Sequence, residues 1–594
     1  MPPEKPTASV GNLFLTGCVI ALGTLGWYLP AFQFPVFHPD DITVFWHRLN
    51  WGVWKSNGGW VGNGRFLQWL IHASVMEHII ELKDYVLFRW LALLFGLFFG
   101  TVLLTRMSNI PAPIGTGLLA LLFISPPFAV YFVQAHFVDI LFAGGFAMLS
   151  SAAFIRLLKN RKRPIWYIVT GIAFAWICLH LHQAAWGFFL VPFIFKAATE
   201  ETGLQKRSLL GLGLSIYVSI SLFYWVYFNS LMNWLHPGSM LTERGSLPSG
   251  LSDRPAVFWG DYLYSSLSGY SLFINRWLAI ATAILTSLLC LYGWHRIIGH
   301  HRGLGWQLLA WSALPAFLLL SVGPSIASNN FWFAYRLAGP LVALILVITC
   351  LGLWRGIQSP GRVRWIMAVG GLTWVGLYFG NSQWAVQEGL IRTQIREYKI
   401  LRDFVQSSQF ALYSKEWKLI EPERHRGSQV IRGKVEFGTY NSAQDFALVN
   451  YFQILSESAF GPSAGWWLRF QREKNWESYP KYGSNVISLD YLLDPHRPTK
   501  SGLHNLPVTR MPLLGDIYTV SKNRYFSPWM GYLDYAGYDA WHHPKLGRFS
   551  VRPDKENHLR METENLGRLR LSPRSWPDVE AIDSRKPIRL GNGE

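Results

Sequence analysis

The chain has 594 residues, of which 50% are hydrophobic and only 15% are charged. Its formal net charge is +18, but many of the basic residues lie in short loops between apolar runs. No nucleic-acid-binding motif is present, so the charge does not indicate a nucleic-acid partner. The four cysteines lie inside apolar runs without metal-ligand or disulfide spacing, which predicts small buried hydrophobic side chains: Cys18, Cys178, Cys290 and Cys350.

The mean hydropathy of +0.17 averages two unlike parts of the chain. Residues 1–383 contain apolar segments long enough to cross the ~30 Å hydrocarbon layer of a bilayer, and residues 384–594 are polar. We therefore predict an α-helical polytopic membrane protein with about 11 spans and a C-terminal soluble α+β domain. The spans are expected near residues 12–30, 85–105, 111–127, 138–157, 165–181, 184–198, 208–228, 273–293, 306–323, 337–354 and 365–382.

Basic residues predict the orientation of the spans. They gather in one set of loops, near residues 156–163, 196–207, 296–302 and 355–364, whereas the short loops 125–137 and 180–184 contain no Lys or Arg. The positive-inside rule assigns the first set to the cytoplasm. The loop 31–84, the loop 229–272 and the tail 384–594 are then expected on the extracytoplasmic side, the tail only if the number of spans is odd.

The loop 31–84 carries an acidic pair, Asp40 and Asp41, just past the first span. Two amphipathic helices, over residues 42–54 and 66–80, are expected to lie in the membrane interface. A carboxylate there can bind a divalent cation such as Mg²⁺ or Mn²⁺, with Asp41 the candidate ligand, or take a proton from an attacking hydroxyl. The alternative is that one of the two acids caps the helix that starts at residue 42.

Two arginines are candidates for binding a phosphate. Arg65 lies in the sequence G-N-G-R at the head of the second interfacial helix, where a guanidinium and backbone N–H groups suit a phosphate. Arg336 is the only Arg or Lys of its outer loop and can clamp a phosphate or stack on a sugar ring. Each arginine can instead be an interface anchor without a function.

Asp139 lies at the start of the fourth apolar run, and an ionisable group there is a functional candidate. The alternative is an interfacial acid in contact with water. His182 and Gln183 belong to the L-H-L-H-Q turn between the fifth and sixth spans. An H-x-H pair can bind a metal, but a hydrogen bond to a sugar or to backbone is the favoured interpretation.

The polar tail begins with an amphipathic helix within residues 383–410. Strands are expected within 429–437, 486–493 and 517–520, and residues 447–455 suit a helix or a strand. For the tail we predict acceptor docking or contact with a partner.

The order of these features resembles the GT-C glycosyltransferases. An acidic pair after the first span and the sequence W-x-G-N-G-R resemble the bacterial branch that includes O-antigen glucosyltransferases of the serotype-conversion type. The L-H-L-H-Q turn and the late outer Arg336 fit the same branch. The resemblance covers residues 12–383 and leaves the tail unmatched.

The resemblance implies transfer of a hexose from a polyprenyl-phosphate carrier to a glycan or glycolipid at the outer face of the bacterial cytoplasmic (inner) membrane. Asp40 or Asp41 would act as base or metal ligand, and Asp139 would be a second acid. Arg65 and Arg336 would hold the lipid phosphate, and His182 and Gln183 would contact the donor. The absence of W-W-D-x-G argues against asparagine glycosylation.

Other functions remain open from the sequence. The chain has no P-loop, G-x-G-x-x-G opening a helix, G-x-S-x-G or H-E-x-x-H motif, so a nucleotide or nucleotide sugar is not expected as a direct substrate. A polymerase or ligase of surface glycans would also use polyprenyl-linked sugars. A polytopic transporter or flippase is the alternative from a different class, although few charges lie within the spans.

Overall fold

The computed structural model describes most of the helical part of the chain and a set of short strands in the tail. The described residues are 10–34, 36–51, 65–107, 111–159, 163–200, 202–235, 254–269, 276–299, 304–326, 334–406, 416–420, 440–443, 447–460, 469–473, 485–488, 508–511, 515–521, 524–527, 531–537, 540–543, 547–553, 559–563, 567–571 and 579–583.

The chain divides into two compact units. The first, called here the helical unit, comprises Met1–Val36, Trp51–Ile391 and Val430–Phe437. The second, called here the mixed unit, comprises Phe37–Asn50, Arg392–Gln429 and Gly438–Glu594. The loop expected to carry both the acidic pair and Arg65 is therefore shared between the two units.

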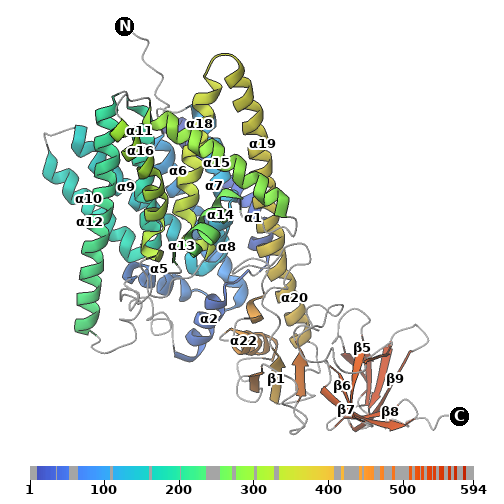
Figure 1. Ribbon diagram of the computed structural model, residues 1–594. Coiled ribbons are helices and arrows are strands. Elements are labelled where there is room, and N and C mark those ends of the chain that lie inside the picture. Colours follow the sequence, from blue (N-terminus) through green and yellow to red (C-terminus); the bar gives the residue numbers. More distant parts are fainter. Residues whose placement is uncertain are drawn as a thin grey trace. The chain divides into compact units, whose positions relative to one another are not determined.

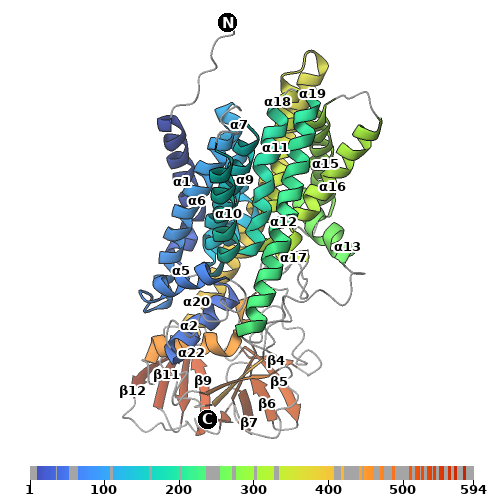
Figure 2. The same ribbon diagram turned by 90° about the vertical axis from the view of Figure 1, so that its left-hand side faces the viewer.

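In the helical unit long helices pack side by side, with α9 between α6 and α10 (Figure 1) and α1 beside α6 (Figure 2). Its helices are α1 (Val10–Gln33), α5 (Phe66–Met76), η1 (Leu82–Tyr85), α6 (Val86–Arg106), α7 (Ala112–Ile124), α8 (Pro126–Val133), η2 (Ala135–Phe137), α9 (Asp139–Lys159), α10 (Pro164–Leu181), η3 (Gln183–Phe189), α11 (Leu190–Thr199), α12 (Gly203–Leu235), α13 (Arg254–Val257), η5 (Phe258–Leu263), α14 (Tyr264–Leu267), α15 (Arg276–Ile298), α16 (Leu304–Ser321), α17 (Gly323–Ile326), η6 (Tyr335–Leu337), α18 (Gly339–Ile357), α19 (Arg362–Trp384) and η7 (Ala385–Arg392).

Within the described residues, six helical segments are long and apolar enough to cross a membrane: Leu82–Arg106, Ala135–Leu158, Pro164–Leu181, Gln205–Leu231, Trp277–Ile298 and Gly339–Ile357. Each coincides with a predicted span. By length and composition the helical unit is thus that of an α-helical membrane protein. The total of eleven spans stays a prediction.

The span expected at residues 111–127 is bent. Helices α7 and α8 meet at Ser125 with their axes 68° apart, so together they form at most one broken span. Pro126 and Pro127 begin α8. Neither has an N–H to donate to the preceding turn, and both fit the first turn of a new helix.

The span expected at residues 184–198 is wound in two ways. Residues 183–189 form the 3₁₀ helix η3, and the ten residues of α11 that follow are α-helical. Ten α-helical residues extend about 15 Å and seven 3₁₀ residues about 14 Å, so only the two parts together approach the ~30 Å of the hydrocarbon layer. The side chain of Gln183 is held by Arg65 and Tyr224, which places a polar contact where the span was expected to begin.

Helices α15 and α18 pack closely because each has a glycine at the contact. A Cβ atom on Gly352 would lie 2.6 Å from the Cα of Gly293, and one on Gly293 would collide with the backbone carbonyl of Ile348. Small residues at such contacts allow helix backbones to approach each other in a membrane.

Substituting Gly293 with alanine is therefore expected to lower the Tm of the helical unit, at a cost of about 1–3 kcal/mol, because the new methyl group meets backbone and the two helices must move apart. Gly370→Ala in α19 is the matched control, since nothing lies within 4 Å of a Cβ there. Thermal unfolding of the detergent-solubilised chain measures both. Equal Tm values for Gly293→Ala and wild type would contradict the close contact.

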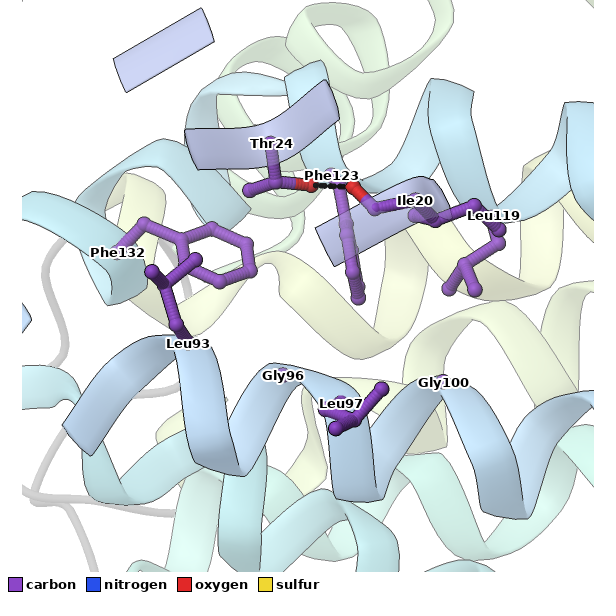
Figure 3. A pocket seen from close by; sticks show the side chains of 9 residues that line it. All are labelled: Ile20, Thr24, Leu93, Gly96, Leu97, Gly100, Leu119, Phe123 and Phe132. Atoms are coloured by element: carbon purple, nitrogen blue, oxygen red, sulfur yellow. Dashed lines mark hydrogen bonds between the residues drawn. The ribbon is translucent and has the colours of Figure 1, made fainter. Parts of the chain in front are cut away.

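A small apolar pocket lies where α1, α6, α7 and α8 meet (Figure 3). Gly96 and Gly100 of α6 form part of its wall, beside the rings of Phe123 and Phe132. The hydroxyl of Thr24 donates to the carbonyl of Ile20 at 2.8 Å, so the polar group of this wall is satisfied within its own helix. The pocket therefore offers packing surface and no charged group.

The mixed unit contains helices and two sheets. Its helices are α2 (Pro39–Trp51), α20 (Thr393–Gln406), η8 (Asn441–Ala443) and α22 (Leu448–Phe460). Residues 447–455, which suit either a helix or a strand by sequence, thus fall mainly in α22. Phe404 of α20 and Phe452 of α22 pack with ring centroids 6.4 Å apart, and Phe37 lies against Tyr398 and Tyr451.

The first sheet is parallel, with β1 (Glu416–Ile420) between β2 (Arg469–Glu473) and β3 (Asn485–Ser488). The second is a nine-stranded antiparallel sheet in which neighbours in sequence are neighbours in space. Its strands are β4 (Val508–Met511), β5 (Gly515–Ser521), β6 (Arg524–Ser527), β7 (Gly531–Gly537), β8 (Ala540–His543), β9 (Gly547–Pro553), β10 (Leu559–Thr563), β11 (Gly567–Leu571) and β12 (Val579–Asp583). The expected strand at 517–520 lies within β5. Most of 486–493 and all of 429–437 lie outside the described residues.

A buried carboxylate joins α20 to η8 in the mixed unit. The backbone N–H groups of Asn441 and Ser442 each donate to Glu397 at 2.8 Å, and the Ser442 hydroxyl donates at 2.6 Å. The side chain of Glu397 is fully buried. Burial raises the pKa of Glu397 to about 7, although the three hydrogen bonds act in the opposite direction. Among the described residues, Tyr451 is a titratable neighbour on which the charge of Glu397 acts.

The stability of the mixed unit is therefore expected to fall as the pH rises from about 4.5 to about 7, by about 3 kcal/mol at most. Over this range the carboxyl of Glu397 is ionised in the unfolded protein and keeps its proton in the folded protein. The folded state therefore binds more protons than the unfolded state. Hydrogen exchange of the backbone amides of α20 and α22 at several pH values measures this change in the free energy of unfolding.

Glu397→Gln should remove the pH dependence, whereas Asp403→Asn, at a half-exposed ion pair with Arg402 on the same helix, should keep it. A pH dependence unchanged in Glu397→Gln would assign the titration to another group.

Candidate functional site

Helix α5 carries two polar residues on one buried face. Gln68 and His72 are four positions apart, so they lie one above the other along the helix. Both are almost completely buried, with exposures of 0% and 2%. They turn toward the start of α9, where Asp139 is the first residue and has no exposed surface.

Asp139 begins α9 and follows the short helix η2, which lies between α8 and α9. The amide nitrogen of Gln68 donates to the backbone carbonyl of His136 and to Oδ1 of Asp139, both at 3.0 Å. Nε2 of His72 lies 3.6 Å from the same carboxylate oxygen. The rings of His72 and His136 meet edge to face, with centroids 6.1 Å apart. Oδ2 of Asp139 is buried and has no hydrogen-bond partner among the described residues.

A second set of polar contacts begins at Arg65, immediately before α5. Nε of Arg65 donates to Oε1 of Gln183 at 3.0 Å, and the amide nitrogen of Gln183 contacts the hydroxyl of Tyr224 at 3.3 Å. These contacts connect α5, η3 and α12. The guanidinium charge of Arg65 also acts on the carboxylate of Asp139.

His182 lies between α10 and η3 and is 1% exposed. Burial, followed by the positive charges of Arg65 and Arg336, lowers the pKa of His182 well below its usual range. The imidazole is therefore neutral at physiological pH. Its Nδ1 is buried and has no hydrogen-bond partner in the described part of the chain.

Arg336 is fixed in the short helix η6, just before α18. Its backbone carbonyl accepts a hydrogen bond from the hydroxyl of Tyr131, and its guanidinium carbon lies 4.5 Å from the centroid of the Phe137 ring. Arg336 is only 8% exposed. A guanidinium in such a position is a fixed positive charge in a low-dielectric environment, where it interacts strongly with an anion.

These residues form what we call the buried polar cluster: Arg65, Gln68, His72, His136, Asp139, His182, Gln183 and Arg336. Five of them are predicted from the sequence as site residues, namely Arg65, Asp139, His182, Gln183 and Arg336. The cluster combines one acid with two arginines and several further hydrogen-bonding groups. The arginines suit an anionic substrate, and the carboxylate of the acid can accept a proton.

The remaining members, Gln68, His72 and His136, are not among the site residues predicted from the sequence. The separation of four positions between Gln68 and His72, in an otherwise apolar helix, was a usable signal for a buried polar face. His136 could have been paired with Asp139 because the two are close in the sequence and lie at the end of η2 and the start of α9. Gln134, also fully buried, precedes η2, and its side-chain amide has no hydrogen-bond partner among the described residues.

The acidic pair belongs to the mixed unit, at the start of α2. Oδ2 of Asp41 accepts the backbone N–H of His38 at 2.8 Å, and Nδ1 of His38 accepts the backbone N–H of Asp40 at 3.2 Å. In the first of these bonds an acid of the first turn reaches back to the residue before the helix, as in one half of a capping box, and in the second His38 caps the backbone of the first turn. The structure thus gives Asp41 a helix-capping contact, and a catalytic role for Asp40 or Asp41 stays a prediction.

In the part of the chain that the structure describes, no three His, Cys, Asp or Glu residues lie close enough together to hold a metal ion. The divalent cation and the ligand role of Asp41 stay predictions. Comparisons with protein-family models, with curated proteins and with solved structures find no match for this chain.

Proposed function

We propose that this protein is a membrane glycosyltransferase that moves a hexose from a polyprenyl-phosphate carrier to a cell-surface glycan or glycolipid. In this proposal the reaction takes place on the extracytoplasmic side of the bacterial inner membrane, where the C-terminal domain also lies. The family suggested by the sequence, the GT-C glycosyltransferases, has this activity.

One observation carries the proposal: the buried polar cluster places a fully buried acid, Asp139, within the electrostatic reach of Arg65 in a unit built of apolar helices. Ionisable groups in such surroundings are costly, so they usually serve a function. Arg336 adds a second cation, which acts on His182 together with Arg65.

The reaction requires few groups because the donor is already activated. A hydroxyl oxygen of the acceptor attacks the anomeric carbon, and the bond from that carbon to the phosphate oxygen breaks. The electron pair leaves on the lipid phosphate, which Arg65 and Arg336 stabilise, and the carboxylate of an aspartate, acting as a general base, takes the hydroxyl proton. A single displacement inverts the anomeric centre, so the stereochemistry of the product tests this step.

The test is a transfer assay with membranes that contain the full chain. Label is expected to pass from radiolabelled polyprenyl-phosphate glucose to envelope glycans, and not from UDP-glucose when the lipid carrier is absent. Transfer from neither donor would contradict the proposal for this sugar, and lipid-linked mannose and galactose repeat the test. Asp40→Asn and Asp41→Asn show in the same assay whether the acidic pair takes part, provided that the amount of folded protein is unchanged.

The pair of Asp139 and His72 favours a second candidate, a proton-coupled transporter. A carboxylate beside an imidazole within an apolar helix bundle is an arrangement that also carries protons. A change of internal pH in proteoliposomes on addition of a polyprenyl-phosphate sugar, without covalent transfer, would favour this candidate.

A further inference from the structure

We infer that Gln68 and His72 are positioning residues for Asp139: they hold one carboxylate oxygen so that the other receives the proton of the acceptor hydroxyl. This inference rests on the proposed glycosyl transfer. It assigns the role of base to the acid at the start of α9 and gives two residues of α5 a part in the reaction.

The first argument is the asymmetry of the carboxylate contacts. Gln68 and His72 both approach Oδ1, at 3.0 Å and 3.6 Å. Oδ2 is equally buried, yet no described residue donates to it. A buried oxygen without a donor costs about 1–3 kcal/mol, so its persistence needs an explanation. A role of Oδ2 as proton acceptor gives that explanation. When the glycan or glycolipid binds, its hydroxyl group supplies the missing hydrogen-bond donor.

The second argument is the orientation of the Gln68 amide. Its two neighbours, the carbonyl of His136 and the carboxylate of Asp139, only accept hydrogen bonds. The nitrogen of the amide must therefore face them, and Gln68 can neither take a proton nor exchange its two ends. By bonding the carbonyl of His136 as well as the carboxylate, Gln68 fixes the backbone just before α9 together with the side chain of Asp139.

The third argument is that rigid elements hold all three residues. Gln68 and His72 lie on one face of α5, and Asp139 is the first residue of α9. Sites supported by helices keep their geometry better than sites on loops.

In the proposed step the hydroxyl oxygen bonds to the anomeric carbon, its proton goes to Oδ2, and the lipid phosphate leaves with the electron pair of the broken bond.

A comparison of two sugar acceptors distinguishes a role of these residues in proton removal from any other role. Envelope glycans present a hydroxyl that must lose a proton, whereas azide is already an anion and attacks the anomeric carbon without a base. Membranes containing the full chain, supplied with radiolabelled polyprenyl-phosphate glucose, are assayed with each acceptor. The variants are Asp139→Asn, Gln68→Met and His72→Phe, and the control is Ser74→Ala on the exposed face of α5.

Transfer to glycan is expected to fall about 10²–10⁴-fold in Asp139→Asn and about 10²-fold in Gln68→Met and His72→Phe, because the carboxylate is misplaced. Formation of glucosyl azide should stay within about threefold of wild type in all three variants. His72→Gln keeps an N–H donor and should lose less than His72→Phe. Ser74→Ala should behave as wild type with both acceptors.

Other outcomes would overturn the inference in distinguishable ways. Loss of azide transfer together with glycan transfer would mean that these residues maintain the fold or bind the donor. Full glycan transfer in Asp139→Asn, with loss in His72→Phe, would make His72 the base. A wild type without transfer to either acceptor would reject the proposed function itself, and the inference with it.

Discussion

Under the proposed glycosyl transfer, replacing Arg336 with glutamine is expected to lower hexose transfer from the polyprenyl-phosphate donor by about 10²–10³-fold. The departing phosphate gains negative charge as the sugar–phosphate bond breaks. A guanidinium that is 8% exposed interacts with that charge in surroundings where water screens little. Glutamine keeps hydrogen-bonding capacity and removes the charge, so the loss measures the electrostatic contribution.

The position of Arg336 makes this substitution informative. Its backbone is held by the hydroxyl of Tyr131, and the ring of Phe137 lies beneath the guanidinium. Both contacts fix the charge in place before the donor binds, so little reorganisation is needed during the reaction. Arg336→Lys keeps a charge and loses the planar fork, and it should fall between wild type and Arg336→Gln.

Arg364→Gln, at an exposed position in the first turn of α19, is the control for a change of net charge. Its transfer rate should match wild type. Size-exclusion profiles of the solubilised variants show whether each is folded. A folded Arg336→Gln that transfers hexose at the wild-type rate would exclude Arg336 from binding the leaving group.

Sequence patterns located the polar residues well, because each interrupts an apolar run. Asp139 and Arg336 lie at the edges of predicted spans, and His182 and Gln183 lie between two of them. What the sequence did not show is which of them meet. Arg65 and Gln183 are 118 positions apart, and Gln68 and Asp139 are 71 apart, so only the packing of α5 against the other helices brings them together.

Helix breaks were the harder feature to predict. The apolar run at 111–127 suits a straight span by composition, but two prolines at its end start a new helix. The run at 184–198 is equally apolar, yet its first half is wound as a 3₁₀ helix that begins at the polar contact of Gln183. Hydropathy measures whether a segment prefers lipid and does not report its winding or its direction.

The acidic pair shows a different limit. Adjacent acids before a helix suit a cap as well as a catalytic site, and the residue types alone do not decide between them. The structure adds the bond from the His38 backbone to Asp41, which depends on the angle at which the chain enters α2. Such local geometry is invisible in a pattern of residue types.

Arg65→Gln is expected to lower transfer by about 10²-fold, and Gln183→Leu by about 10-fold. The reason for the difference is that Arg65 carries the charge, whereas Gln183 is neutral and accepts a hydrogen bond of 3.0 Å from the guanidinium. If Gln183 acts only by holding the guanidinium of Arg65, replacing Gln183 should not lower the transfer rate further once Arg65 has been replaced.

The double variant tests this dependence. Its transfer rate should be close to that of Arg65→Gln alone. The coupling free energy between the two residues is then about 1.4 kcal/mol, which is the whole of the tenfold effect of Gln183→Leu. Tyr224→Phe removes the hydroxyl at the far side of Gln183 and should reproduce part of the Gln183→Leu effect. Strictly additive losses would mean that Gln183 acts on the substrate by itself. The donor-binding group would then include the start of η3 as well as the arginine before α5.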